Sequence, residues 1–544
     1  MIKFTGKGVY GAIAVGKIAV FKRQETNVDK VQITDTEAEK ARVVAAKAQA
    51  MEQLQKVYDK AMAEVGENEA QIFEVHMMML DDEDFNDTIN ETIEKEGVNA
   101  EFAVAAARDQ FSEMFAAMDD SYFQARAADV KDISNRLLAC LGGGLGSAET
   151  SDEKVIICAD DLAPSETVSL DKEKCLAFAT AYGSSNSHTA ILARNMNIPA
   201  IIGLGDTFLT SIKDGDMCCV DGYTGEVIIS PDEETIARFE EKRKKDLEDK
   251  ALLENLRGKE DVTIDGTHVN IFCNIGGPKN VPSVFENDGR GIGLFRSEFL
   301  YLENDDFPTE DQQFEAYKQV LEAMEGRKVI IRTLDIGADK QVDYFNLDKE
   351  ENPAMGLRAI RICLTRPEIF KTQLRALYRA SVYGNLGIMF PMITSESEIS
   401  EIMGFCDIVR AELDSEGIPY SQDVEHGIMI ETPAAAVISD KLAPMVDFFS
   451  VGTNDLTQYT LACDRQNSKI EKFVDTHHEA ILRLIEMSAK NAHANGAWIG
   501  ICGELGADTT LTERFLRMGI DELSVSPPSV LKVRDAVRKI DLSK

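Results

Sequence analysis

Polar residues that could do chemistry recur at one kind of place in the second half of the chain, at the ends of short apolar runs. Five of the eight ends carry Arg, Arg, Glu, Asn-Asp and Cys, a combination that packing alone does not explain. If the runs are strands of a closed parallel barrel, their ends meet on one face, where barrel enzymes have their active sites. The eight ends are Asn274, Arg296, Arg332, Met392, Glu431, Asn454-Asp455, Cys502 and Ser526.

Three arginines near these ends indicate an anionic ligand. Arg296 and Arg332 end two of the runs, and Arg465 follows shortly after Asp455. Guanidinium groups bind phosphates and carboxylates through pairs of parallel hydrogen bonds. The arginines therefore predict a clamp for a ligand that carries both phosphate and carboxylate groups.

Two carboxylates and a thiol complete this candidate site. Glu431 and Asp455 are hard oxygen ligands without a nearby His or thiolate pair, which suits Mg²⁺. The alternative is that they form ion pairs with the arginines. Cys502 follows WIGI and precedes a glycine, so we expect it at a strand end where it need not be buried. There it could donate a proton or attack as a thiolate, the alternative being an ordinary core cysteine.

A second candidate site is the segment 183–194, GSSNSHTAILAR. A turn rich in glycine and serine leads into a predicted helix from Ser187 to about Met196, with Ser187 as N-cap and His188 in the first turn. A helix start disfavours an imidazolium and would stabilise a phosphoryl group placed on the ring. A neutral imidazole there is a good nucleophile towards a phosphate ester. A structural role is the alternative for His188, and we expect it for the other histidines.

The elements that would position the first site are eight predicted strands alternating with helices over residues 262–544. Their number and the length of this region favour a (β/α)₈ barrel, with an open doubly wound sheet as the alternative. The predicted strands lie in segments 269–276, 291–298, 328–335, 386–392, 426–432, 448–455, 498–504 and 522–527.

The first half of the chain predicts an α/β domain interrupted by helices. One or two short strands are expected in 1–21, and five more in segments 154–160, 175–180, 200–203, 217–221 and 226–230. We therefore predict an α/β domain formed by 1–34 and 141–231, with an inserted helical bundle at 35–140. A charged stretch without proline predicts a solvated linker helix over 232–261, joined to the barrel at 262–544.

Composition and charge exclude several functions. The 544 residues suffice for about three to four domains and for a core that needs no disulfide or metal. The net charge of −36 argues against nucleic acid or an anionic membrane, and favours a basic protein partner or an anionic substrate. The ten cysteines lack CxxC spacing and mostly lie in apolar runs, which indicates buried thiols in a reducing cytosol. Without a signal peptide or a run of ~18 apolar residues, we expect a cytoplasmic protein with no membrane insertion.

Several strings resemble one family over essentially the whole chain. GIGLFRSEFLYL, IRTLDIGADK, NPAMGLRAIR, FFSVGTNDLTQYTLACDR and GICGELGAD are similar to enzyme I of the bacterial sugar phosphotransferase system, the phosphoenolpyruvate-protein phosphotransferases. The resemblance implies a phosphotransferase with a nitrogenous acceptor, which uses phosphoenolpyruvate and Mg²⁺. It also implies a phosphohistidine domain, a helical subdomain that docks the phosphocarrier HPr, and a barrel that forms a homodimer.

The resemblance also implies a role for each matching residue. His188 matches the histidine phosphorylated on Nε2, and Cys502 matches the acid that protonates the enolate. Glu431 and Asp455 match the Mg²⁺ ligands. The phosphoenolpyruvate contacts match Arg296, Arg332, Asn454, Asp455 and Arg465. In the helical region, the acidic run Asp81–Asp84 beside Phe85 suits a partner with a basic patch.

The histidine segment departs from the family pattern. The family usually has Gly-Gly-x-Thr-Ser-His, whereas 183–188 reads GSSNSH, so a glycine and a threonine are replaced. Two alternatives to a sugar-transport enzyme remain. One is an enzyme of the same chemistry that serves a nitrogen-regulatory carrier, and the other is a catalytically weak paralogue that acts as a regulatory binding protein.

Overall fold

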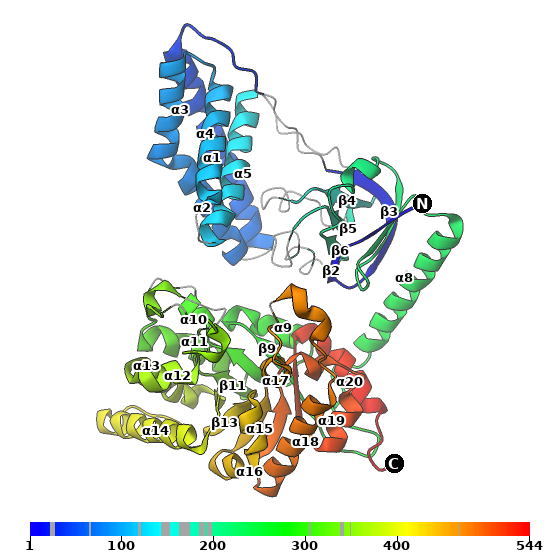
Figure 1. Cartoon of the computed structure of the whole chain (residues 1–544), viewed down its shortest axis with the longest axis vertical. Helices are drawn as coiled ribbons and strands as arrows, with labels where there is room; N and C mark the ends of the chain where they lie inside the picture. The colour runs from blue at the N-terminus through cyan, green and yellow to red at the C-terminus, as the bar shows by residue number, and fades with distance from the viewer. Residues whose placement is uncertain are drawn as a thin grey trace. The chain divides into compact units, whose positions relative to one another are not determined.

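The computed structural model describes the chain outside residues 22–27, 65–66, 118–120, 143–152, 163–173, 184–189, 191–192, 194–197, 303, 305, 338–341, 349 and 466. The chain divides into two units, Met1–Asp249 and Lys250–Lys544 (Figure 1). The helix that contains this boundary is α8, Glu233–Glu254.

An eight-stranded sheet forms one part of the first unit. Strands β3 to β6 run parallel, while β1, β2, β7 and β8 are antiparallel to their neighbours, in the order β1-β8-β7-β3-β4-β5-β6-β2. The first 21 residues hold three strands where one or two were predicted, because Gly6 and Gly11 separate short extended segments. The strands are β1 Ile2–Thr5, β2 Lys7–Tyr10, β3 Ile13–Val20, β4 Val155–Ala159, β5 Cys175–Thr180, β6 Ala200–Ile202, β7 Met217–Asp221 and β8 Glu226–Ile229.

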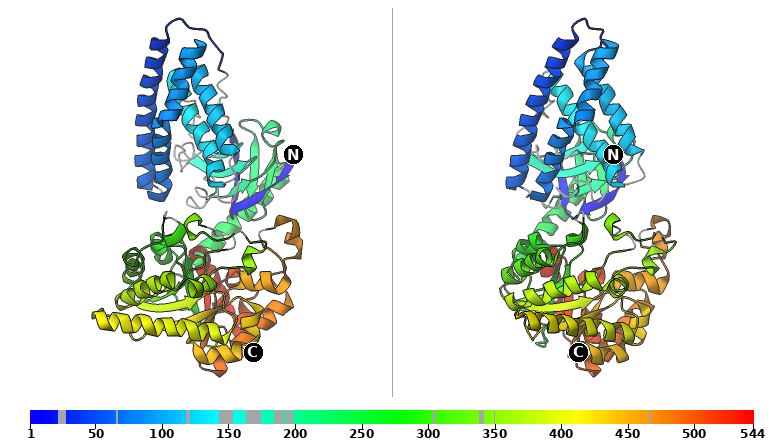
Figure 2. Two further views of the ribbon diagram at one scale, coloured as in Figure 1. Left: turned by 60° about the vertical axis from the view of Figure 1, so that its left-hand side comes forward. Right: turned by 90° about the vertical axis from the view of Figure 1, so that its left-hand side faces the viewer.

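Five helices are inserted between β3 and β4 in the sequence, and they pack side by side around a core of their own (Figure 2). Leu54, Phe73, Ile89, Val104 and Leu137 are buried in that core. The helices are α1 Thr36–Glu64, α2 Glu67–Asp81, α3 Glu83–Glu96, α4 Ala100–Ala116 and α5 Ser121–Gly142.

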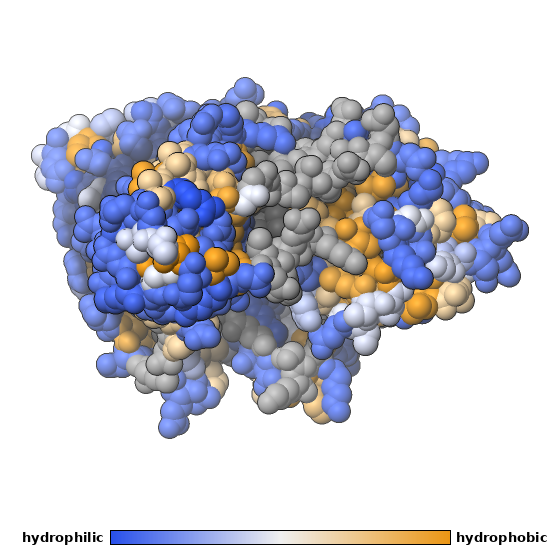
Figure 3. Space-filling model, turned by 90° about the horizontal axis from the view of Figure 1, so that it is seen from above, coloured by the Kyte–Doolittle hydropathy of each residue, from blue (hydrophilic) through white to orange (hydrophobic). Residues whose placement is uncertain are grey.

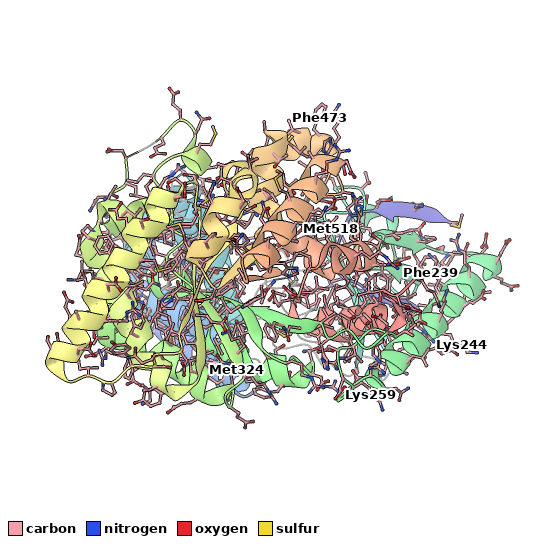
Figure 4. All side chains as sticks on the ribbon, turned by 90° about the horizontal axis from the view of Figure 1, so that it is seen from below. Phe239, Lys244, Lys259, Met324, Phe473 and Met518 are labelled. Atoms are coloured by element: carbon pink, nitrogen blue, oxygen red, sulfur yellow. The ribbon has the colours of Figure 1, made fainter. Side chains whose placement is uncertain are left out.

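Helix α8 follows the sheet of the first unit, and its N-terminal half packs on that sheet. Phe239 is fully buried against Ile13, Val15 and Ile228. The Lys242 ammonium lies 3.1 Å from Asp221 Oδ2. Figure 4 labels Phe239 and Lys244 on this helix.

The second unit contains a closed barrel of eight parallel strands, so the predicted barrel is confirmed and the open doubly wound sheet is wrong. All eight predicted strands form, and the ring closes where β16 pairs with β9, with Glu522 opposite Asn270. The strands are β9 Asn270–Ile275, β10 Ile292–Arg296, β11 Lys328–Arg332, β12 Asn385–Phe390, β13 Glu425–Ile430, β14 Phe448–Val451, β15 Trp498–Ile501 and β16 Glu522–Val525.

Helices surround the barrel strands, and the main core lies between the two layers. They are α9 Val281–Glu286, α10 Phe299–Leu302, α11 Glu310–Ala323, α12 Ile360–Thr365, α13 Pro367–Ala380, α14 Glu396–Glu416, α15 Pro433–Val437, α16 Ser439–Leu442, α17 Thr453–Leu461, α18 Glu479–Ala494, α19 Thr512–Met518 and α20 Val530–Lys539. The segment between α8 and β9 is attached to the barrel by Arg534 of α20. The Arg534 side chain is completely buried. Its guanidinium donates hydrogen bonds to the carboxylates of Asp261 and Asp288.

The surface seen in Figure 3 is mostly hydrophilic, with apolar residues in separate areas. Among the described residues, no helix has both the length and the apolar character needed to cross a membrane. All ten cysteines belong to the described part of the chain and are free thiols, and all but Cys140 are buried.

Candidate functional site

The C-terminal ends of the barrel strands bring the predicted residues of the first site to one face. Arg296 and Arg332 are the last residues of neighbouring strands and are opposite each other in register. Glu431 directly follows β13, and Cys502 directly follows β15. Asn454 and Asp455 lie in the first turn of α17, which begins just after β14. Parallel strands place such residues at one mouth of the barrel, as the sequence predicted.

A buried network of charges occupies this mouth, and three of its members, Glu298, Asp335 and Arg358, were not predicted. Asp335, which follows β11, accepts from Arg332 Nη1 at 2.8 Å and from Arg358 Nη2 at 2.9 Å. Arg332 also pairs with Glu298. Burial disfavours the charge of both guanidinium groups, but the neighbouring carboxylates outweigh it and raise the pKa of Arg332 and Arg358. These arginines therefore stay charged inside the protein.

Asp455 faces two arginines. Its Oδ1 lies 3.3 Å from Arg358 Nη1, and its Oδ2 lies 3.8 Å from Arg465 Nη2. For Asp455, the ion-pair alternative is therefore realised in this structure. Asn454 has a different contact, because its Oδ1 accepts from the backbone N–H of Glu504 at 3.2 Å and so joins α17 to the loop after β15.

Glu431 differs from Asp455 because one of its oxygens has no partner in the part of the chain that the structure describes. Its side chain is 1% exposed, and Oε1 accepts from the backbone N–H of Met392 at 2.6 Å. Met392 adopts φ 59°, a costly conformation for a residue with a side chain, and such strain is common at functional sites. Oε2 has no hydrogen-bond partner among the described residues. Burial and the charges of Asp455 and Asp335 raise the pKa of Glu431 to about 8.

An unpartnered carboxylate oxygen beside a second carboxylate fits a divalent cation. A Cβ on Gly452 would lie 3.1 Å from Glu431 Oε2, so the glycine leaves this oxygen room. The described residues hold no cluster of three or more His, Cys, Asp and Glu arranged for a metal. A site with two carboxylates suits Mg²⁺, which takes its other ligands from water and substrate oxygens.

Cys502 is buried, and the prediction that it need not be buried is wrong. It is 4% exposed, and its thiol donates to the carbonyl of Val451 at 3.6 Å. Gly503 explains the burial, because a Cβ there would lie 1.9 Å from Thr453 Oγ1, so the start of α17 packs directly on the strand end. Burial raises the pKa of the Cys502 thiol to about 12. The neutral thiol suits a proton donor and argues against a thiolate nucleophile.

Most of the second predicted site, including Ser187 and His188, lies outside the described residues. The structure does show what precedes these two residues. Strand β5 ends at Thr180, whose hydroxyl donates to the carbonyl of Tyr182 at 2.6 Å. Gly183 has φ 111°, a value that favours glycine.

We expect Asp335→Ala to destabilise the barrel by about 3–5 kcal/mol, because two buried arginines would lose a shared counter-charge. The measurement is urea unfolding followed by tryptophan fluorescence, since the only tryptophan of the chain, Trp498, lies in β15. Asp535→Ala is the control, since its ion pair with Lys539 on α20 is largely exposed and contributes under about 0.5 kcal/mol. Equal unfolding midpoints for the two variants would contradict the role given to Asp335.

Comparison with known proteins agrees with this geometry. Family models of PEP-utilising enzymes match the chain in three places: the N-terminal domain at 5–126, the mobile domain at 151–225 and the PEP-binding domain at 250–542. The phosphoenolpyruvate-protein phosphotransferase of Priestia megaterium is 44% identical over 536 residues, covering 98% of this chain and 93% of that protein. The one from Bacillus subtilis is 43% identical over 541 residues, covering 99% and 95%.

A solution structure described as Enzyme I (nEIt) is 33% identical to this chain, with a TM-score of 0.39, and covers 44% of this chain and 98% of its own. The sequence relatives span nearly the full length of both proteins and share the predicted family. The chain therefore belongs to the phosphoenolpyruvate-protein phosphotransferases, a family of PEP-utilising enzymes.

Proposed function

We propose that this protein transfers the phosphoryl group of phosphoenolpyruvate to its own His188 and then to a histidine of the phosphocarrier HPr, the first steps of sugar uptake by the phosphotransferase system. The observation that carries the proposal is the mouth of the barrel, which holds two buried arginines and a carboxylate oxygen of Glu431 that has no partner among the described residues. This arrangement matches an anionic substrate that arrives with a divalent cation.

Arginines bind the substrate in this proposal. Arg296, Arg332 and Arg465 contact the phosphate and carboxylate of phosphoenolpyruvate, and Asn454 donates from its amide. The ion pair between Arg332 and Asp335 supports this part of the proposal. With 2.8 Å between Arg332 Nη1 and Asp335 Oδ2, the guanidinium is already positioned before any substrate binds. Such preorganisation reduces the entropy lost on binding and places positive charge where the transition state gathers negative charge.

Glu431 and Asp455 would hold Mg²⁺. The ion, when bound, neutralises phosphate charge and acts as a Lewis acid. Both carboxylates would hold the ion, and Asp455 would also contact the substrate. Because Asp455 already faces Arg358 and Arg465, its position is set by two charged neighbours.

The chemical step breaks the bond between phosphorus and the enol oxygen and forms a bond from phosphorus to His188 Nε2. The enolate of pyruvate is left, and Cys502 gives its thiol proton to the methylene carbon. The buried, protonated thiol supports this role. The phosphoryl group then passes from His188 to the carrier, which requires the histidine to serve two sites in turn.

The other parts of the proposal concern organisation. The phosphohistidine domain consists of residues 1–34 and 141–231, and the inserted helices at 35–140 dock HPr. The linker at 232–261 joins the two halves. The barrel at 262–544 forms the homodimer. Residues 81–84 are exposed acids that suit a basic partner, with Met78 72% exposed one turn earlier. Phe85 is buried and stacks edge-on with Phe111, so it belongs to the core of the helical bundle. We place the enzyme in the cytoplasm.

The decisive experiment is the intact mass of the protein after mixing with phosphoenolpyruvate and Mg²⁺. The proposal expects one added acid-labile phosphoryl group and one pyruvate released per chain. HPr should then remove the group. Absence of any added mass would favour the regulatory paralogue, and transfer only to a nitrogen-regulatory carrier would replace HPr by that partner.

We expect Glu431→Gln to lower phosphotransfer by roughly 10²–10³-fold, because a Lewis-acid metal supplies several kcal/mol of transition-state stabilisation. The measurement is the initial rate of pyruvate formation over a range of Mg²⁺ concentrations. Glu425→Gln is the matched control, since Glu425 begins the same strand and pairs with Lys328 at the opposite end of the barrel. A Glu431→Gln rate close to that of the control at low Mg²⁺ would remove Glu431 from the metal site.

A further inference from the structure

The interior of the barrel below Cys502 has two chemically different sides. On the side of β10 to β13, the interior is filled by Leu294, Ile330, Met389 and Met429. On the side of β14, β15, β16 and β9, polar groups lie above Phe448 and Trp498, which begin β14 and β15. These are Asn274, Ser450, Cys502, Glu522 and Ser524, all of them strand or strand-end residues. The polar side contains a carboxylic acid that the proposed reaction does not use.

Glu522 is that acid, and the barrel is shaped around it. Its side chain is 1% exposed, and the Ser524 hydroxyl donates to Oε1. A Cβ on Gly500 would lie 1.8 Å from Oε2, and a Cβ on Gly293 would lie 2.3 Å from Oε1. Strand β15, next to β16, and strand β10, on the far side of β9, therefore carry glycine where any side chain would displace the carboxyl group. The carboxyl occupies the interior space that those side chains would fill.

The register of the strands places Glu522 one step below Cys502. Gly500 is opposite Glu522 on one side and opposite Ser450 on the other. Gly500 lies in β15, and Cys502 directly follows that strand. Because the two residues are two positions apart, they face the same side of the sheet, with about 7 Å between them along the strand. Ser450 lies beside this step, because it is opposite Gly500 on the neighbouring strand and directly precedes Val451, whose carbonyl accepts from the Cys502 thiol.

The polar groups on this path have unused hydrogen-bonding capacity. Ser450 Oγ, Glu522 Oε2 and Asn274 Oδ1 are all buried, and none has a hydrogen-bond partner of good geometry among the described residues. Buried polar groups of this kind usually bind an ordered water. A hydroxyl and a water between a carboxylic acid and a thiol form a path along which a proton can move.

The carboxyl group has a proton to give at neutral pH. Burial raises the pKa of Glu522 to about 8, and the charge of Asp521 acts in the same direction. The hydrogen bond from Ser524 opposes this rise only in part.

We propose that Glu522 resupplies the proton that Cys502 loses in each turnover, an inference that rests on the proposed function. Cys502 gives its S–H proton to the methylene carbon of the enolate and becomes a thiolate. The O–H bond of Glu522 breaks, the proton passes through Ser450 and a water, and a new S–H bond forms. The carboxylate left on Glu522 then takes a proton from solvent water. Glu522 acts through Cys502 and does not touch the substrate.

Isotope exchange separates this role from a structural one. Phosphorylated enzyme with pyruvate interconverts pyruvate and phosphoenolpyruvate, so labelled carbon exchanges between them without any need to renew the thiol proton. Deuterium from heavy water enters the pyruvate methyl group only if the thiol proton is renewed from outside. The ratio of deuterium uptake to carbon exchange therefore measures the proposed resupply.

We expect Glu522→Gln, which keeps the shape of the side chain, to lower that ratio at least 10-fold while carbon exchange changes by less than about 3-fold. Ser450→Ala should lower the ratio in the same direction, and it decides the question if Glu522→Gln does not fold. Glu425→Gln, at the far end of the barrel, should leave the ratio unchanged. An unchanged ratio in Glu522→Gln, or in Ser450→Ala, would overturn the inference. A lack of carbon exchange in the unmutated protein would instead overturn the proposed function.

Discussion

The His188→Ala variant is expected to gain no phosphoryl group from phosphoenolpyruvate, whereas the unmutated protein gains one. The alanine side chain has no nucleophile and so cannot accept the phosphoryl group. Intact-protein mass under conditions that preserve acid-labile phosphate is the measurement, with pyruvate release recorded in parallel. We expect both signals to disappear while the barrel, which lies in the other unit, still binds phosphoenolpyruvate.

His493→Ala is the control for this experiment. His493 lies near the end of α18, is partly exposed and pairs with Asp521 at 2.8 Å, so its loss should leave phosphorylation unchanged. If the phosphoryl group persists in His188→Ala and disappears in His493→Ala, the acceptor lies in the second unit and is not His188.

The Cys502→Ser variant is expected to lower steady-state pyruvate formation by about 10²–10⁴-fold, the usual contribution of a general acid. Serine keeps nearly the same volume, but its hydroxyl is a far weaker acid than a thiol. Proton transfer to carbon is needed to release pyruvate but not to phosphorylate His188. Phosphorylation by one equivalent of phosphoenolpyruvate should therefore survive better than turnover, and protonation should lose its stereospecificity. The measurements are turnover and the stereochemistry of deuterium incorporated from heavy water.

Cys463→Ser is the matched control, because Cys463 is also a buried thiol that donates to a carbonyl, that of Leu461 at 3.4 Å. It should lose little activity. If Cys502→Ser behaves like this control in both turnover and stereochemistry, Cys502 is only a packing residue at the end of β15.

The strands of the barrel could be predicted because each is a short apolar run bounded by turns, and that pattern is local. The same pattern placed Arg332, Glu431 and Cys502 at strand ends. In a parallel barrel, residues at the strand ends lie together on one face, so their grouping could be predicted as well. The first strands of the chain were undercounted, because Gly6 and Gly11 divide a stretch of extended residues into three short strands.

The residues that the sequence could not assign act through contacts between distant parts of the chain. Asp335 and Arg358 look like ordinary loop charges until the fold places them 2.9 Å apart inside the protein. The pattern G-L-R in 356–358 could have drawn attention to Arg358, since the string that contains it carried the family resemblance. Glu522 begins a strand, where a charge is normally solvated, and only Gly500 and Gly293 reveal that it is enclosed. The burial of Cys502 depends on Gly503 and the start of α17, which no local pattern describes.

The contact between Arg534 and Asp261 has a consequence for biosynthesis, because it joins residues that are 273 positions apart. A ribosome adds about 5–20 residues per second, so Asp261 emerges on the order of 10–50 s before its partner. Over that interval the growing chain exposes the edge of β9, whose neighbour β16 has not been synthesised. The first unit, complete by Asp249, can fold during this time. The order of synthesis thus produces a finished N-terminal half first and leaves the barrel open until β16 is released.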